Sequence, residues 1–319
     1  MELDRVSHLF NALVDEVGKV IVGQAELVEG IIIALFSEGS VLIEGVPGLG
    51  KTLLVNTLAK AIACDFKRVQ FTPDLMPSDL TGHNVYDMGE KRFHFNPGPI
   101  FTNLLLADEI NRSPPKTQSA LLEVMQERQV TVDGECHVLS KPFLTIGTQN
   151  PLEHEGTYPL PEAQMDRFMF KLFVEYPTGE EENRILDHYA EGRDPRRLDS
   201  YNLQPVMQAS EVEEIQAAVA GVIVEPKVMS YITAIVAQTR DWHAVSVGSS
   251  PRGSVNLFLG ARTLAACHGR DFVTPDDVKE LAPWVLRHRL HLRPEAEIEG
   301  FTPDQILRQI LDGIEVPRS

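Results

Sequence analysis

The sequence predicts an α/β domain built on a parallel sheet, followed by a small all-helical domain. Through residue 177, short apolar runs of strand type alternate with stretches of helical spacing, which is typical of a parallel sheet flanked by helices. From residue 201 onward the apolar spacing is helical and few strand signals remain. We therefore expect domains at residues 1–177 and 201–319, joined by a linker at 178–200.

The elements of the first domain follow from apolar periodicity. Strands are predicted at residues 41–44, 66–71, 104–107, 143–148 and 170–174. Helices are predicted at residues 6–20, 51–63, 115–127 and 162–168, with a further apolar helix ending at Phe36. The strand at 104–107 is continuously apolar, so we expect it to be buried on both faces of the sheet.

Two connections in the first domain read as β-hairpins. Residues 83–96 place two strand-like runs around Met88-Gly89-Glu90, and residues 129–139 turn at Asp133-Gly134, a dipeptide that suits a tight hairpin turn. The residues alone leave open whether these inserts are functional or are surface decoration.

The second domain is predicted to contain helices at residues 211–220, 226–239, 255–268 and 275–287. Thr274 has the character of an N-cap, with Pro275 at the first helical position and Asp277 in the first turn. A basic group follows the last of these helices and includes His288 and Arg289, and we expect it to be a solvated helix end.

The most specific motif is a glycine-rich loop between the first strand and the following helix. It matches the pattern G-x-x-x-x-G-K-[ST] at every specified position. Its glycines allow backbone N–H groups to surround a phosphate, and the helix start adds the positive end of its dipole. Lys51 is expected to reach the β- and γ-phosphates, and the Thr52 hydroxyl to bind Mg²⁺. The loop consists of Gly45, Val46, Pro47, Gly48, Leu49, Gly50, Lys51 and Thr52. The chain is thus predicted to bind a nucleoside triphosphate.

A pair of carboxylates supports a hydrolytic site. Asp108 and Glu109 end the apolar strand at 104–107, at the edge of the sheet where the phosphate loop lies. Asp108 can hold Mg²⁺ or its waters, and Glu109 can polarise a water for in-line attack on the γ-phosphate. Such a pair is common by chance, but its position after a phosphate loop gives it weight.

Three further residues are candidates for the same chemistry. Asn150 ends the next strand and could contact the γ-phosphate or orient the attacking water, although an Asn before Pro151 also suits a turn. Arg167 has no obvious path to its own phosphate, so it could act on a neighbour's γ-phosphate, or simply pair with Asp166. Arg252 lies in the first turn of a helix, where the dipole disfavours a cation, and this favours a functional role.

The composition limits the classes of partner. The chain has 29 Lys and Arg against 46 Asp and Glu, a net charge of −17, which makes nucleic acid an unlikely main partner. Its start lacks a signal-peptide core, and no apolar run approaches the length that spans a membrane. These features predict a cytoplasmic protein.

The order of these elements resembles the AAA+ ATPases, and four long strings resemble the MoxR group within them. The strings cover residues 44–52, 105–118, 126–134 and 147–168, and the resemblance extends over nearly the whole chain. Met165 and Gly147 depart from the residues usual in that group, Leu and Ala, without touching the predicted chemistry.

The resemblance implies a ring, a homo-oligomer of hexameric type, with ATP and Mg²⁺ bound at the subunit interfaces. It implies Walker A roles for Lys51 and Thr52 and Walker B roles for Asp108 and Glu109. The remaining implied roles are sensor 1 for Asn150, a finger acting in trans for Arg167, sensor 2 acting in cis for Arg252, and adenine contact for Val22, Gly23 and Gln24.

The resemblance also suggests what the ring does. The hairpin at 83–96 would be the helix-2 insert and that at 129–139 the pre-sensor-1 hairpin, both facing the pore or a partner. MoxR-like ATPases act as chaperone-like remodellers, often with a von Willebrand A domain protein, and some assist metal-cofactor insertion; the client is not written in the sequence.

Two alternatives to remodelling stay open. A nucleic-acid motor would use Lys91, Arg92 and His94 of the first hairpin, but Asp133 and Glu135 of the second hairpin oppose it. A nucleotide-dependent assembly switch would use turnover only to reset the assembly.

Overall fold

The computed structural model describes residues 1–46, 48–151 and 156–317. Within these residues a five-stranded sheet has the order β2-β5-β8-β1-β9, and every neighbouring pair is parallel. The strands are β1 (Val41–Glu44), β2 (Phe66–Gln70), β5 (Leu104–Asp108), β8 (Leu144–Gln149) and β9 (Phe170–Phe173). The predicted α/β class is confirmed, with small shifts at the strand ends.

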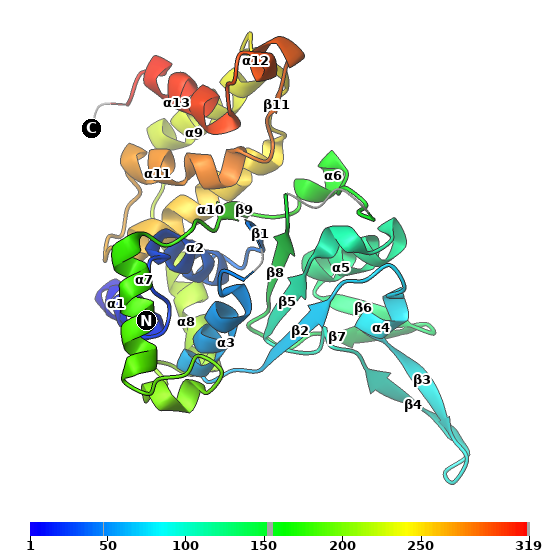
Figure 1. Cartoon of the computed structure of the whole chain (residues 1–319). Helices are drawn as coiled ribbons and strands as arrows, with labels where there is room; N and C mark the ends of the chain where they lie inside the picture. The colour runs from blue at the N-terminus through cyan, green and yellow to red at the C-terminus, as the bar shows by residue number, and fades with distance from the viewer. Residues whose placement is uncertain (47, 152–155, 318–319) are drawn as a thin grey trace.

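Helices cover both faces of this sheet (Figure 1). On one face, a core joins inward side chains of β1, β5 and β8 to α1 (Leu3–Gly18), α2 (Ala25–Phe36) and α3 (Lys51–Ala61). On the other face, a second core includes side chains of α4 (Pro77–Thr81) and α5 (Pro115–Glu127).

Alternate residues of β5 enter these two cores. Leu104 and Leu106 belong to the first core, and Leu105 and Ala107 to the second, and all four are fully buried. Successive side chains of a strand point to opposite faces of its sheet, so a continuously apolar strand can fill both cores. The predicted burial of this strand is confirmed.

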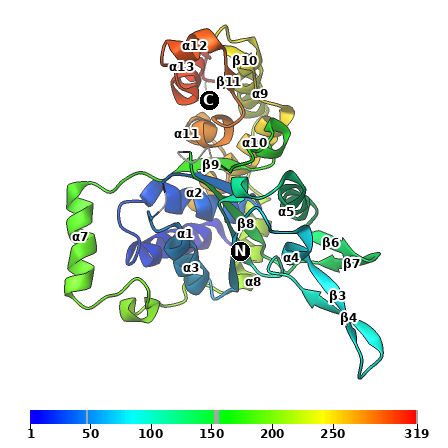
Figure 2. The ribbon, with the colours of Figure 1, turned by 45° about the vertical axis from the view of Figure 1, so that its right-hand side comes forward.

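Both predicted hairpins are present. The first pairs β3 (Gly82–Asp87) with β4 (Arg92–Pro97), and the second pairs β6 (Gln129–Val132) with β7 (Glu135–Val138). Asp133 and Gly134 have φ of 50° and 88°, and positive φ at both central residues is what a type I′ turn requires. Figures 1 and 2 show the β3–β4 hairpin extending away from the sheet.

The stretch between the sheet and the C-terminal helices contains α7 (Gly179–Ala190) and a 3₁₀ turn (Leu198–Tyr201). Thr178 caps α7, because its hydroxyl accepts a hydrogen bond from the backbone N–H of Glu181. None of the residues of α7 is buried, and Figure 2 shows the helix at one side of the molecule.

The C-terminal part is helical, as predicted, apart from one short ribbon. It contains α8 (Ala209–Val219), α9 (Pro226–Asp241), α10 (Pro251–Cys267), α11 (Pro275–Leu286), α12 (Pro294–Ile298) and α13 (Pro303–Gly313). The last two were not predicted, and neither was the antiparallel ribbon of β10 (Val245–Val247) and β11 (His291–Leu292). Thr274 caps α11 as expected, accepting from the backbone N–H of Asp277.

The C-terminal helices share the first core with α1 and α2. Ile215 of α8, Leu264 of α10 and Trp284 of α11 all belong to it. Trp284 also donates its indole N–H to the Glu26 carboxylate at 2.6 Å and packs edge-on against Phe170 of β9. Trp284 thus joins α11 to α2, through a residue 258 positions away, and to the sheet. No helix among the described residues has the length and apolar character needed to cross a membrane.

Candidate active site

The phosphate loop joins the end of β1 to the start of α3 and needs its glycines for different reasons. Gly48 and Gly50 have φ of 87° and 77°, a left-handed conformation that side chains rarely adopt. At Gly45 a Cβ would lie 2.9 Å from the carbonyl oxygen of Val174, so close packing excludes a side chain there. The predicted loop residue Pro47 lies outside the described residues.

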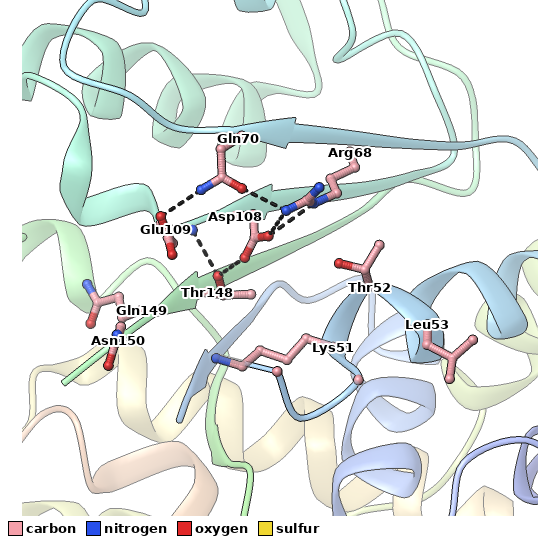
Figure 3. A pocket seen from close by; sticks show the side chains of 12 residues that line it. Lys51, Thr52, Leu53, Arg68, Gln70, Asp108, Glu109, Thr148, Gln149 and Asn150 are labelled. Carbon is pink, nitrogen blue, oxygen red and sulfur yellow. Dashed lines mark hydrogen bonds and ion pairs between the residues drawn. The ribbon is translucent and has the colours of Figure 1, made fainter. Parts of the chain in front are cut away.

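A cavity of about 370 Å³ lies beside this loop (Figure 3). The carboxyl ends of β2, β5 and β8 and the start of α3 surround it, the place where ligands bind in open α/β sheets. Its lining comprises Gly48, Gly50, Lys51, Thr52, Leu53, Arg68, Gln70, Asp108, Glu109, Thr148, Gln149 and Asn150. The structure therefore brings together five of the residues predicted to handle the triphosphate: Lys51, Thr52, Asp108, Glu109 and Asn150.

The Lys51 ammonium is placed to bind an anion in this cavity. Its ammonium donates to the carbonyl oxygen of Gly45 at 2.5 Å. Burial lowers the pKa of Lys51, while the charges of Asp108, Glu109 and Glu44 raise it in part. Phosphate oxygens in the cavity would favour the charged form of this partly desolvated ammonium.

Asp108 offers oxygen ligands of the kind that Mg²⁺ prefers. Its Oδ1 accepts from the Thr148 hydroxyl at 2.5 Å, and its Oδ2 accepts from Arg68 at 2.6 and 3.0 Å. The Thr52 hydroxyl lines the same cavity. A carboxylate and a hydroxyl beside room for phosphate and water fit Mg²⁺, which keeps several waters and few protein ligands.

Glu109 is held in an unusual conformation. Its φ of 56° and ψ of 51° place it in the left-handed region, where the chain turns sharply out of β5. Its backbone N–H donates to Thr148 Oγ1 at 2.9 Å. Its Oε2 accepts from Gln70 Nε2 at 2.6 Å and lies 3.2 Å from Arg112 Nε. Strained backbone of this kind is concentrated at functional sites, and here the surrounding bonds fix where the carboxylate points.

Arg68 and Gln70 were not predicted as site residues. Both lie on β2, next to β5 in the sheet, and Figure 3 shows their side chains directed at the two acidic residues. The available signal was that two of the three polar residues in the predicted strand at 66–71, Arg68 and Gln70, alternate along it, but the place of this strand beside β5 could not be predicted from the sequence.

A second cavity of about 320 Å³ adjoins the first and shares Gly48, Gly50 and Leu53 with it. Val22 and Gln24, predicted to contact adenine, line it. Gly23 lies between them with a φ of 75°, and a Cβ there would lie 2.5 Å from the Glu181 carboxyl carbon. The remaining lining consists mainly of apolar and aromatic side chains. It includes Val20, Ile21, Leu49, Pro177, Ile185, His188, Tyr189, Pro195 and Tyr201. Such a cavity suits a planar base.

Arg167 and Arg252 line neither of these two cavities in the described part of the chain. Arg167 lies between α6 (Glu162–Met165) and β9 and donates to the Leu122 carbonyl oxygen at 3.3 Å. Arg252 is in the first turn of α10, where its N–H donates to the Ser250 hydroxyl. The Asp166 carboxylate, considered as a partner for Arg167, binds Arg289 and Ser250.

The predicted solvated helix end at His288 and Arg289 is wrong. His288 is 7 % exposed and Arg289 is 4 % exposed, because the segment between α6 and β9 packs over them. Burial and the charge of Arg289 hold the pKa of His288 well below its usual value. A run of basic residues can thus form a buried contact when backbone carbonyls and a carboxylate surround it.

Comparison with known proteins agrees with this geometry. Residues 40–170 match the family described as "ATPase family associated with various cellular activities (AAA)", and residues 237–310 match the AAA lid domain. The chain is 42% identical to Chaperone MoxR1 of Mycobacterium tuberculosis over 98% of this chain and 83% of that protein. This chain belongs to the MoxR family of AAA+ ATPases. It is also 30% identical to Protein MoxR of Methylorubrum extorquens, over 95% of this chain and 93% of that protein.

A solved structure supports the same assignment for this MoxR-family ATPase. A crystal structure of a protein from Cytophaga hutchinsonii, described as a candidate ATPase, has a TM-score of 0.91 and 41% identity. The match covers 99% of this chain and 97% of the other. The chain is therefore an ATPase that binds nucleotide, and its relatives include a named chaperone.

Proposed function

We propose that ATP binds with its phosphates in the first cavity and its base in the second. Lys51 then contacts the β- and γ-phosphates, Glu109 polarises the attacking water, and Asn150 orients it. Thr52 and Asp108 would hold Mg²⁺, which neutralises phosphate charge when bound. The observation that carries this proposal is the meeting of the loop, the two carboxylates and Asn150 in one cavity.

We further infer that the ATPase works as a homo-oligomeric ring, of hexameric type, with the ATP site completed by a neighbour. Arg167 lies outside both cavities of its own chain within the described residues, which supports a role on the adjacent subunit. A guanidinium delivered there would stabilise the charge that develops on the γ-phosphate. Arg252 would sense the nucleotide from the C-terminal helical domain of the same chain, called the lid below.

The test is a mixing experiment with two inactive variants. Arg167→Ala subunits keep Glu109 but lack the finger, and Glu109→Gln subunits keep the finger but cannot activate water. If Arg167 acts in trans, mixed rings regain turnover at interfaces where a Glu109→Gln subunit supplies Arg167 to an Arg167→Ala site. Turnover is followed by phosphate release as the ratio of the two variants is varied.

Formation of mixed rings is checked by differently tagged subunits that co-purify in ATP. No recovery at any ratio, with mixed rings present, would show that Arg167 does not act in trans. The control is a mixture of Arg167→Ala subunits with wild-type subunits, which carry both the finger and an active Glu109.

We propose that the ring remodels a client protein, together with a von Willebrand A domain partner. The β3–β4 hairpin supports this proposal, because it exposes large apolar side chains that a protein partner could cover. Tyr86 is 48 % exposed, Phe93 69 % and Met88 85 %. Exposed apolar groups gathered on one projecting element are typical of interaction surfaces. The name of the M. tuberculosis relative, a chaperone, supports the same reading.

The same hairpin gives less support to a nucleic-acid motor. Arg92 pairs with Glu90 at 2.5 Å, which neutralises part of the positive charge available there. The chain as a whole carries −17. A salt-sensitive affinity for DNA, coupled to faster ATP turnover, would overturn the protein-remodelling proposal. Turnover that no partner alters, with binding controlled by nucleotide alone, would instead favour an assembly switch.

A further inference from the structure

The segment that carries Arg167 is attached to the lid at one buried contact, here called the seam. On one side of it are Asp166, Phe168 and Met169, and on the other are Ser250 and Arg289. We propose that Arg289 is a positioning residue that fixes the Arg167 segment to the lid, so that lid movement changes where Arg167 points. This inference rests on the proposed role of Arg167 in trans.

Arg289 binds the backbone on both sides of Arg167. Its side chain is 1 % exposed. Its Nε donates to Asp166 Oδ1 at 2.7 Å, and its Nη2 donates to the carbonyl oxygens of Asp166 and Phe168 at 2.9 and 2.6 Å. Its Nη1 reaches the Met169 carbonyl oxygen at 3.3 Å. The planar guanidinium has its donors in a fixed fork, so this set of bonds defines the path of the segment as well as holding it.

Asp166 connects the seam to the helix that carries Arg252. The second oxygen of its carboxylate accepts from the Ser250 hydroxyl at 2.8 Å. Ser250 is the N-cap of α10, and Arg252 lies in the first turn of that helix. Asp166, which directly precedes Arg167, therefore binds both Arg289 and the start of the helix that carries Arg252. A shift of α10 with nucleotide state would be passed to Arg167 through Asp166.

Apolar packing holds α6 only through Met165, which is partly buried against the second core. None of its residues is buried, and a cavity of about 250 Å³ lies between α6 and the lid, lined by Glu162, Asp166 and His291 among others. His291 Nε2 lies 3.5 Å from the Glu162 carboxylate across it, a contact between exposed side chains. Beyond Arg167 the segment is also held by apolar packing, because Phe168 and Met169 are 0 and 3 % exposed and belong to the two cores. On the α6 side of Arg167, its position depends on the polar bonds of the seam.

The test adds Arg289→Lys to the mixing experiment. Lysine keeps the charge but lacks the fork, so it cannot reach the same set of acceptors. In the finger donor, the Glu109→Gln subunit, Arg289→Lys should lower the recovered turnover by about tenfold or more, as a misplaced catalytic group does. In the acceptor, the Arg167→Ala subunit, the same change should have a much smaller effect, because that subunit has no finger to misplace.

Arg270→Lys in the donor is the matched control. Arg270 also makes a close ion pair within the lid, to Asp277 at 2.5 Å, and its other partners among the described residues are Phe272 and His268 rather than the Arg167 segment. It should leave the recovered turnover unchanged. Asp166→Asn in the donor is the second variant, to be used if Arg289→Lys fails to fold by circular dichroism, and the same directional loss is expected.

The outcomes separate the two proposals. No recovery in the parent mixture removes the trans role of Arg167 and this inference with it. Recovery that is indifferent to Arg289→Lys in the donor would overturn the inference and leave the finger intact. Equal losses from donor and acceptor, or from Arg270→Lys, would indicate general lid damage and would overturn it as well.

Discussion

Cationic side chains differ in their bonding between the first cavity, where we propose that the phosphates bind, and the seam. In the cavity, Lys51 donates to one carbonyl oxygen among the described residues, and the Arg68 side chain is 45 % exposed. In the seam, the Arg289 side chain is 1 % exposed and binds a carboxylate and several carbonyl oxygens. A cation with spare donors can bind a ligand. A cation whose donors are all used can only hold other parts of the protein in place, so the same charge has a different function in each region.

The largest expected effect lies in the cavity. Lys51→Ala should abolish nucleotide binding, because the lost ammonium is the main positive charge beside the loop. Glu109→Gln should keep binding and lower turnover by about a hundredfold or more, since it removes the group that polarises water. Binding is measured with a fluorescent ATP analogue and turnover by phosphate release. Normal turnover in Glu109→Gln would remove Glu109 from the mechanism.

The cavity could be predicted from the sequence because its geometry is local. The loop from Gly45 to Thr52 is continuous, and a strand before it with a helix after it fixes its direction. Asp108 and Asn150 end strands of a parallel sheet, and such ends meet at one edge. Short-range rules were therefore enough to gather these residues around one site.

The seam could not be predicted, because its partners are between 84 and 123 residues apart in the chain. Asp166 and Arg289 meet only when the lid packs on β9, and nothing in the local sequence around His288 and Arg289 distinguishes a buried end from a solvated one. The same holds for Gln70, whose bond to Glu109 depends on β2 lying beside β5. Strand order and lid docking are tertiary facts that periodicity does not encode.

The second cavity, where we propose that the base binds, could be predicted only in part. Its loop residues were predicted, while its aromatic wall on α7 was not. Tyr189 lines this cavity and is 53 % exposed, so its ring has surface that a bound base can cover. Tyr189→Ala should raise KM for ATP about tenfold with kcat nearly unchanged, because stacking on a base contributes about 1–3 kcal/mol.

Leu186→Ala is the control for this prediction. Leu186 lies on the same helix and is 64 % exposed, but it is not among the residues that line the cavity. It should leave KM unchanged. A loss of kcat in Tyr189→Ala at saturating ATP would mean that α7 acts on the chemical step, and the base contact would need to be reconsidered.

The smallest expected effect tests the burial of the seam through the pH dependence of His288, whose Nε2 lies 3.1 Å from the Phe168 carbonyl oxygen. The folded state holds the pKa of His288 well below 6.5, so the unfolded chain binds its proton more readily. The contribution of His288 to stability is therefore complete above pH 6.5 and is lost as pH falls below it, by at most about 1.4 kcal/mol per pH unit.

His288→Gln cannot take up that proton. Its unfolding free energy, measured in urea between pH 7.5 and about 5.5, should therefore fall less steeply with falling pH than that of the wild type. His83→Gln, at an exposed position on β3, should keep the wild-type slope. Equal slopes for wild type and His288→Gln would mean that water reaches His288, and that the seam is more open than its bonds indicate.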